Sequence, residues 1–271
     1  MIKQAIIPLA GLGTRLLPLT SVFAKELLPI NGKPGIEYIL DECIDAGIKE
    51  VIFIISNKKK MIKTYFYNDN FYKKIIKKKK DKRIKEEYKK ILKYKKMIKF
   101  VYQNKPLGTG DAVLKTKKFI KHNFFLMLLP DDLIIKKNCS KSMIEIHNRY
   151  KTSVMACMSV SKKNVSRWGI FKLGKKINKK NYYIKDVIEK PSVVNAPSNK
   201  AVIGRYILPK TIFLKLSKQK SGKGGEVHIT DAIQKLIFEN SKFIAHNFSG
   251  KYLDCGSMKG YINSTLEISK S

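Results

Sequence analysis

Two cations accompany a glycine-rich turn near the start of the 271-residue chain. The turn is Gly11-Leu-Gly-Thr-Arg15, it follows an apolar segment at 3–8, and Lys25 lies ten residues beyond Arg15. Glycines let a backbone approach phosphates closely, free N–H groups form an anion site, and Arg and Lys suit the charge of a triphosphate. Leu16 stands where the GxGxxG fingerprint needs its third glycine, which disfavours a dinucleotide fold. The alternative is an ordinary turn between strand and helix with two surface cations.

A pair of carboxylates offers a candidate metal site. Asp131 and Asp132 follow the strongly apolar segment 124–129, which has the length of a buried strand. Ligands of open α/β sheets gather at the carboxyl ends of strands, and Mg²⁺ prefers oxygen ligands. A carboxylate at this position is therefore well placed to hold Mg²⁺. The alternative is a turn or a helix cap, for which Asp residues at a strand end are also typical.

Two further strand ends carry polar side chains that could bind a ligand. Gln103 follows an expected strand at 100–102, and its amide could pair with the donor and acceptor edge of uracil. Glu189 and Lys190 end another expected strand, where a carboxylate suits sugar hydroxyls and a lysine suits a phosphate. Without other context, Gln103 is more typical of a polar loop and the Glu-Lys pair of an exposed strand end.

The apolar pattern predicts the elements that must position these groups. A strand at 3–8, a helix with apolar residues recurring from Ile36 to Ile44, and a strand at 51–55 follow one another, which predicts parallel strands with right-handed crossovers. Further strands are expected at 124–129, 153–160, 168–173, 182–189, 201–207 and 242–248, and further helices at 140–150, 209–217, 229–237 and after Gly256. We therefore expect an α/β fold with a Rossmann-like, mixed and mainly parallel central sheet flanked by helices, in a single domain over residues 1–271.

Composition argues against several classes of protein. Hydrophobic residues make up 44% of the chain, enough for a sizeable core, yet no apolar run is long enough to span a membrane. Four cysteines without a CxxC pair argue against a disulfide scaffold or a zinc module. The N-terminus has no signal-peptide pattern, so we expect a cytoplasmic protein that binds no membrane.

Positive charge is concentrated between residues 58 and 99. The chain has a net charge of +35, and this segment holds 18 Lys and one Arg against four acidic residues. Interspersed apolar residues make the segment compatible with helices. Only five of the 56 basic residues are Arg, the residue that reads nucleic acids by bidentate contacts. We therefore expect mutational drift on a solvated face and no specific nucleic-acid partner, with a functional polyanion site as the alternative.

Taken in order, the motifs resemble the signature of sugar-1-phosphate nucleotidyltransferases from about residue 3 to about residue 265. The variant Ala10-Gly-Leu-Gly-Thr-Arg15 is similar to that of bacterial UTP–glucose-1-phosphate uridylyltransferases. The other matching motifs are Lys25-Glu-Leu-Leu-Pro29, Gly32-Lys-Pro34, Leu107-Gly108, Leu129-Pro-Asp131, Trp168-Gly169, Glu189-Lys-Pro191, Gly204-Arg-Tyr206, Gly225-Glu-Val-His-Ile-Thr-Asp231 and Asp254-Cys-Gly256. The sequence departs from the family at Leu107-Gly-Thr-Gly-Asp-Ala112, where the family often has Gly-Leu-Gly-His-Ala.

The resemblance implies a nucleotidyltransferase fold, similar to glycosyltransferase A, and a reaction of UTP with glucose 1-phosphate that gives UDP-glucose and pyrophosphate. It also implies homo-oligomers, and Mg²⁺ held by Asp131 and Asp254. The implied catalytic residues are Arg15, Lys25 and Lys190. The implied nucleotide-binding residues are Ala10, Gly11, Gly13, Thr14, Gln103 and Gly108, and the implied sugar-binding residues are Gly169, Glu189 and Gly204. The alternatives are a thymidylyltransferase that makes dTDP-glucose and, in another class, a lysine-rich nucleic-acid-binding protein.

Overall fold

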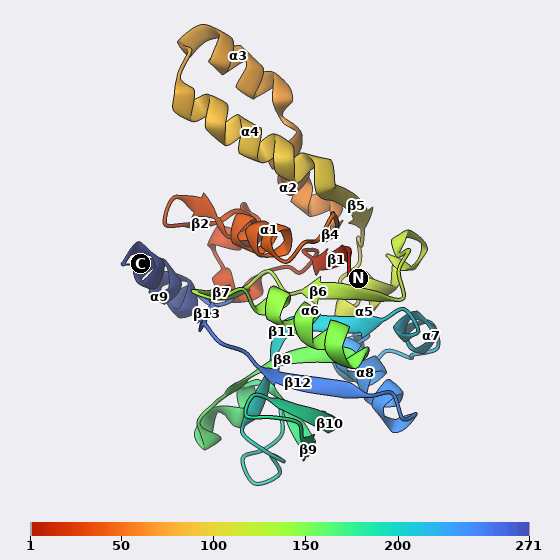
Figure 1. Ribbon diagram of the computed structural model, residues 1–271. Coiled ribbons are helices and arrows are strands. Elements are labelled where there is room, and N and C mark those ends of the chain that lie inside the picture. Colours follow the sequence, from red (N-terminus) through yellow and green to blue (C-terminus); the bar gives the residue numbers. More distant parts are fainter. Residues whose placement is uncertain (1, 271) are drawn as a thin grey trace.

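A nine-stranded mixed sheet forms the centre of the computed structural model, which describes residues 2–270 (Figure 1). Its strands are, in spatial order, β5 (Ile98–Tyr102), β4 (Glu50–Ile55), β1 (Gln4–Pro8), β6 (Phe124–Leu128), β11 (Lys200–Pro209), β8 (Ser153–Ser159), β12 (Phe243–Asn247), β10 (Asn181–Glu189) and β9 (Gly169–Lys176). The first four are parallel, as the order of strand, helix and strand predicted. Beyond β6 the pairing is antiparallel except between β8 and β12. The expected mixed sheet is confirmed, and its run of consecutive parallel strands lies in the N-terminal half.

Helices cover both faces of this sheet. They are α1 (Gly35–Asp45), α2 (Lys60–Tyr67), α3 (Asp69–Lys79), α4 (Lys82–Met97), α5 (Thr109–Leu114), α6 (Cys139–Tyr150), α7 (Ile212–Ser217), α8 (Ile229–Phe238) and α9 (Met258–Ser269). Residues of α1 and α6 share one apolar cluster with Ala5 and Ile7 of β1, whereas residues of α5, α7 and α8 share another with Ile6. Since both faces are covered, the parallel strands read as continuous apolar runs in the sequence.

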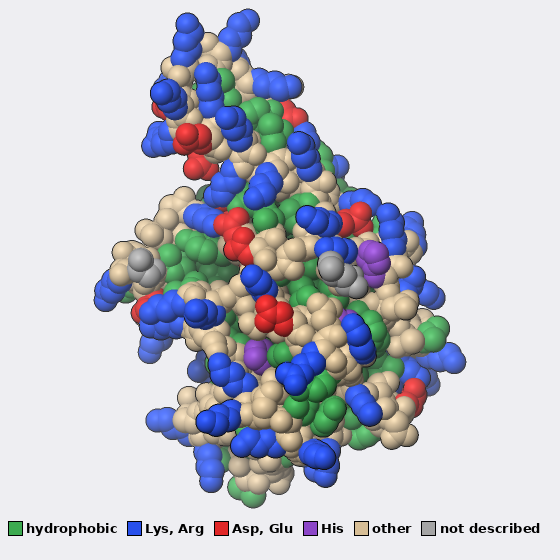
Figure 2. All heavy atoms as spheres, viewed as in Figure 1, with side chains coloured by type: hydrophobic (Ala, Val, Ile, Leu, Met, Phe, Trp, Pro, Cys, Tyr) green, Lys and Arg blue, Asp and Glu red, His purple; other side chains and the backbone are tan. Residues whose placement is uncertain are grey.

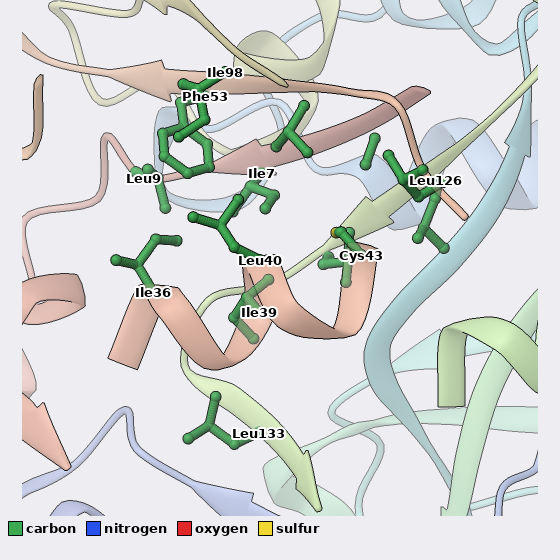
Figure 3. Packing of buried hydrophobic residues seen from close by; sticks show 14 of the residues in the cluster. Ile7, Leu9, Ile36, Ile39, Leu40, Cys43, Phe53, Ile98, Leu126 and Leu133 are labelled. Carbon is green, nitrogen blue, oxygen red and sulfur yellow. The ribbon is translucent and has the colours of Figure 1, made fainter. Parts of the chain in front are cut away.

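The contact between α1 and the sheet illustrates the helical periodicity. Ile36, Leu40 and Cys43 of α1 point toward the sheet, where Ile7 of β1, Phe53 of β4 and Leu126 of β6 lie (Figure 3). Ile39 belongs to the same apolar cluster and lies on the side of Leu133. These side chains are fully buried. Each contributes on the order of 1.5–3 kcal/mol when removed from water, so the stripe holds α1 across three strands.

Two short antiparallel pairs were not predicted. One joins β7 (Asp132–Ile135) to β13 (Lys251–Asp254), and the other joins β2 (Pro29–Ile30) to β3 (Lys33–Pro34). Strands of two to four residues carry too little alternation to stand out in a sequence. The first pair matters for function, because it brings the C-terminal Asp254 to the turn that follows β6.

The lysine-rich segment forms α2, α3 and α4. The hairpin of α3 and α4, residues 69–97, projects from the body and is called the arm below (Figure 1). Tyr72 and Tyr88 stack within it with their ring centroids 5.1 Å apart, and α3 has no buried residue. At the base of the arm the Tyr94 hydroxyl donates to Asp41 of α1 at 2.6 Å. Lys and Arg side chains are numerous on the face of the arm seen in Figure 2, with a few hydrophobic and acidic side chains between them.

The remaining sequence expectations concern thiols and membranes. All four cysteines are free and buried, and burial raises the pKa of the Cys255 thiol to about 11. Among residues 2–270, no helix combines the length and apolarity that crossing a membrane requires.

Candidate active site

A cavity of about 500 Å³ opens at the carboxyl ends of β1, β5 and β6. Its walls come from the turn after β1, from the segment 103–112 and from Leu129 to Asp131. The predicted nucleotide-binding residues Ala10, Gly11, Gly13, Thr14, Gln103 and Gly108 all line it. The ends of β1, β5 and β6, which are far apart in the sequence, thus meet at one edge of the sheet, where ligands of open α/β sheets gather.

The turn after β1 exposes backbone donors to the cavity. Gly13 has a φ of 71°, and its carbonyl accepts a hydrogen bond from the Thr20 hydroxyl at 2.8 Å. A side chain at Gly13 would be strained at this φ and would approach Thr20 to 3.1 Å, so glycine is required. Within the described part of the chain, no hydrogen bond uses the N–H groups of residues 11–13. These donors form a site suited to an anion.

Opposite charges meet at the end of β6. Lys25 Nζ lies 2.7 Å from Asp131 Oδ2, and Arg15 Nη2 lies 3.5 Å from the same oxygen. Burial would raise the pKa of Asp131, but the charge and hydrogen bond of Lys25 hold it below its ordinary value. Burial would likewise lower the pKa of Lys25, but Asp131 raises it above its ordinary value. Both groups are therefore ionised, while Arg15, whose side chain is 67% exposed, remains free to turn towards a ligand.

Asp254 reaches this cluster through the pairing of β7 with β13. The register places Asp254 opposite Asp132, and the Cys255 N–H donates to the Asp131 carbonyl at 2.8 Å. A side-chain carbon at Gly256 would lie 2.7 Å from Arg15 Nη2, 2.8 Å from Asp131 Oδ2 and 3.2 Å from Asp254 Oδ1. Both carboxylates and one guanidinium therefore gather around Gly256, where any side chain would crowd them.

Asp132 has a different environment from its neighbour. Its two oxygens accept hydrogen bonds from the Tyr252 hydroxyl at 2.6 Å and from the Gly204 N–H at 2.8 Å. Burial, followed by the charge of Asp131, raises the pKa of Asp132 to about 6. The side chain joins three strands, β7, β11 and β13, and so acts as a structural partner of the turn.

A buried ion pair beneath the turn was missed by the sequence analysis. Arg205 is fully buried and forms a bidentate pair with Glu42 of α1, with Nη2 2.7 Å from Oε2. Its guanidinium also donates to the carbonyls of Leu129 at 3.2 Å and Asp132 at 2.7 Å, on either side of Asp131. The available signal was an arginine inside the apolar run Ile203 to Leu208, because a cation there needs a buried partner.

Gln103 is held by residues of the loop that follows it. It is 4% exposed, and its Nε2 donates to the Gly108 carbonyl at 3.0 Å and to Asp111 at 2.7 Å. Gly108 has a φ of 94°, and a side chain there would approach the Val227 carbonyl to 2.7 Å. The motif that begins at Gly225 therefore supports this loop through Val227, which also donates to the Leu107 carbonyl at 2.8 Å.

The predicted sugar-binding residues lie on the antiparallel half of the sheet. Gly169 pairs with Glu189 across β9 and β10, and Glu189 Oε2 would lie 3.0 Å from a side-chain carbon at Gly169. Lys190 follows with a φ of 46°, and its N–H donates to the Trp168 carbonyl at 3.0 Å. Gly204 is buried against Leu129 and Asp132, which gives it a packing reason to be glycine.

The charges of Glu189 and of Asp132, which follows β6, affect the same tyrosine. The Tyr206 hydroxyl is buried, and its pKa is raised by burial and then by the charges of Asp132 and Glu189. The charges of Asp132 and Glu189 thus act on the same hydroxyl. Glu189 and Gly169 come together, and Lys190 lies next to them, outside the lining of the cavity described above.

The chain is similar to known proteins over almost its whole length. A profile of the family described as Nucleotidyl transferase matches residues 4–271. The UTP–glucose-1-phosphate uridylyltransferase of Bacillus subtilis is 35% identical over 98% of this chain and 91% of its own length. The chain belongs to the nucleotidyltransferase family.

Solved structures of nucleotidyltransferases support the same fold. A UDP-glucose pyrophosphorylase in complex with UDP-glucose has a TM-score of 0.87 and 35% identity, covering all of this chain and 99% of that one. The solved structure of a Bacillus anthracis protein described as a glucose-1-phosphate thymidylyltransferase has a TM-score of 0.76 and 20% identity, covering 98% of this chain and 95% of that one. The second likeness shows a shared fold alone, so the greater similarity is to the uridylyl branch of the family.

Proposed function

We propose that the chain transfers a uridylyl group from UTP to glucose 1-phosphate, which yields UDP-glucose and pyrophosphate. One observation carries the proposal: Asp131 and Asp254 border a common space with Arg15, next to Lys25 and the free N–H groups of the glycine-rich turn. Such a set suits a nucleoside triphosphate and a divalent cation together. The names of the relatives support uridine and glucose as the specific substrates.

The reaction needs positioning and charge neutralisation more than proton transfer. An oxygen of the sugar phosphate attacks the α-phosphorus in line, and the bond to the bridging oxygen of pyrophosphate breaks. A phosphate dianion is already a nucleophile, so no general base is required. Catalysis then depends on alignment and on cations at the oxygens where charge develops.

The cations on this chain divide between the two substrates. Arg15 and Lys25 would neutralise the β- and γ-phosphates as pyrophosphate leaves, and the N–H groups of residues 11–13 would hold the same anion. Lys190 would hold the incoming phosphate against the repulsion between two anions, and Glu189 would orient the hexose through its hydroxyls. Gln103 would contact the base, since it lines the cavity close to the glycine-rich turn.

The donor set at Gly256 fits Mg²⁺. Asp131 and Asp254 supply the oxygen ligands that a hard cation prefers, and Gly256 keeps the space between them free of a side chain. Within residues 2–270, no three His, Cys, Asp or Glu side chains gather as a closed metal site. A site of two carboxylates suits Mg²⁺, which keeps waters and shares substrate phosphates. When bound, Mg²⁺ offsets negative charge on the phosphate oxygens.

A substrate matrix tests the proposal. Pyrophosphate release is measured with each nucleoside triphosphate and each sugar phosphate in turn, and the sugar nucleotide is identified by mass. We expect activity that requires Mg²⁺ and prefers UTP with glucose 1-phosphate. Equal or greater turnover with dTTP at subsaturating nucleotide would assign the chain to thymidylyl transfer instead.

A further inference from the structure

The loop that holds Gln103 also restricts what its amide can recognise. We infer that Asp111 is a positioning residue that fixes the Gln103 amide with its carbonyl oxygen towards the nucleobase, and so selects bases that present an N–H at this point. The inference rests on the proposed function and adds the element of its site that selects the base.

Two acceptors around the Gln103 amide fix its orientation. Gln103 Nε2 donates to Asp111 Oδ2 at 2.7 Å and to the Gly108 carbonyl at 3.0 Å. A carboxylate and a backbone carbonyl can only accept hydrogen bonds. The NH₂ group must therefore point at both, and a flipped amide would set its oxygen against two acceptors.

The remaining polar atom of the Gln103 amide is its carbonyl oxygen, Oε1. Both donors of the Gln103 amide are used, and no hydrogen bond within the described residues reaches Oε1. Since Gln103 lines the cavity, the chemistry that it can offer a ligand there is that of an acceptor. A base that meets this oxygen with a donor gains a hydrogen bond, and one that meets it with a lone pair is repelled.

An acceptor at Oε1 distinguishes between bases by the atom at position 3 of a pyrimidine ring. Uracil and thymine carry an N–H at position 3 of the ring, whereas cytosine carries a lone pair at that atom. An amide fixed as an acceptor therefore favours UTP and dTTP over CTP, and leaves the choice between uracil and thymine to other contacts. An amide that could flip would lose this discrimination.

Asp111 is the part of this arrangement that substitution can change. The Gly108 carbonyl belongs to the backbone, whereas Asp111 is a side chain in the first turn of α5 and is 14% exposed. Its other oxygen lies 3.3 Å from Lys115 one turn later. A carboxylate can only accept hydrogen bonds, so Asp111 makes the amide orientation unambiguous.

The test compares UTP and CTP in matched variants. Asp111→Asn keeps the shape but offers either a donor or an acceptor to the amide, and we expect the ratio of kcat/KM for UTP to that for CTP to fall about tenfold, which corresponds to roughly 1.4 kcal/mol. Lys115→Met removes the other partner of Asp111 and leaves the amide held, so its ratio should match that of the unmodified chain. If Asp111→Asn shows no cooperative thermal unfolding, Asp111→Ser, whose hydroxyl also donates or accepts, is measured in the same way.

The outcomes separate this inference from the proposed function. An unmodified chain that releases no pyrophosphate from UTP would overturn the proposed function itself. An unmodified chain that is active with UTP but has an equal kcat/KM for CTP would overturn the inference alone. A ratio in the folded Asp111 variant within twofold of the unmodified value would also overturn it, because the amide would then be held by something other than Asp111.

Discussion

The turn after β6 and the arm both carry many charges, but they use them differently. At the turn, the Lys25 and Asp131 side chains are 16% and 18% exposed and contact each other directly. On the arm, α3 has no buried residue and its lysines face solvent. Charges in a partly buried site interact strongly, whereas exposed charges are screened by water and salt. Burial and partners, more than the number of charges, therefore distinguish the proposed active site from the arm.

The largest expected effect comes from the two carboxylates that border Gly256. Asp131→Asn and Asp254→Asn should each reduce turnover by a factor on the order of 10³ or more, because a lost metal ligand removes several kcal/mol of charge stabilisation. Steady-state kinetics at limiting Mg²⁺ measures the loss. Asp132→Asn is the matched control with a milder expected loss, since Asp132 bonds to Tyr252 and Gly204. Near-normal activity in either of the first two variants would remove that residue from the site.

The buried pair beneath the turn should dominate stability. Glu42→Gln leaves Arg205 without its counter-charge in the core and should lower the free energy of unfolding by about 3–5 kcal/mol. Urea unfolding followed by circular dichroism measures it. On the arm, Asp69 pairs with Lys95 at the surface, and Asp69→Asn should leave the unfolding midpoint unchanged. Equal destabilisation by both substitutions would remove the contrast between the two regions.

The three cations proposed to act in catalysis should each affect the kinetics of one substrate. Arg15→Ala and Lys25→Ala should each lower kcat by a factor on the order of 10² to 10³, as expected for groups that stabilise charge developing in the transition state. Lys190→Ala should instead raise KM for glucose 1-phosphate, since that phosphate is a dianion before reaction as well. Kinetics with each substrate varied in turn distinguishes the cases. A Lys190 variant with impaired UTP binding and an unchanged KM for glucose 1-phosphate would show that this strand end faces the nucleotide.

Asp132 gives the turn a distinct dependence on pH. Its pKa rises from the ordinary 3.8 to about 6 on folding. The folded chain therefore binds more protons here than the unfolded chain between about pH 4 and pH 6, and the contribution of Asp132 to stability falls as pH rises through that window. Asn cannot titrate, so the unfolding free energy of the unmodified chain relative to Asp132→Asn should decrease from pH 4.5 to pH 6.5. A difference that is constant with pH would mean that Asp132 keeps an ordinary pKa.

The smallest effect is expected on the arm. Replacing Lys77 to Lys80 by Gln should change turnover by less than about twofold, because these side chains are exposed on a hairpin that projects from the body. Any nucleic-acid binding should be weak, independent of sequence and lost steeply with salt, which filter binding at several salt concentrations can measure. Tight binding at physiological salt would restore the polyanion function of the arm.

Long, periodic elements could be predicted from the sequence, whereas long-range pairings could not. The stripe of α1 and the apolar runs of β1 and β6 follow from local pattern, and each has the position expected. The pairing of β7 with β13 joins short strands more than a hundred residues apart, and no local pattern encodes it. Asp254 was a candidate ligand because of the resemblance of the motifs to a known family, since no periodic pattern indicates it.

The same limit applies to side chains within the site. The glycine-rich turn predicted an anion site at Arg15 and Lys25 from residue types alone. The partner of Gln103 is Asp111 and that of Arg205 is Glu42. These pairs depend on the folded loop at 103–111 and on the packing of β11, so residue types alone do not predict them.

The most direct test of the account is a crystal structure of the chain with UTP and Mn²⁺ in place of Mg²⁺. We expect an anomalous manganese peak within coordination distance of the Asp131 and Asp254 carboxylates, the triphosphate beside Arg15 and Lys25, and the uracil beside Gln103. A metal away from both carboxylates, or a nucleotide bound to the lysines of the arm, would contradict the claim that the few partnered charges at the turn, and not the many exposed ones, form the active site.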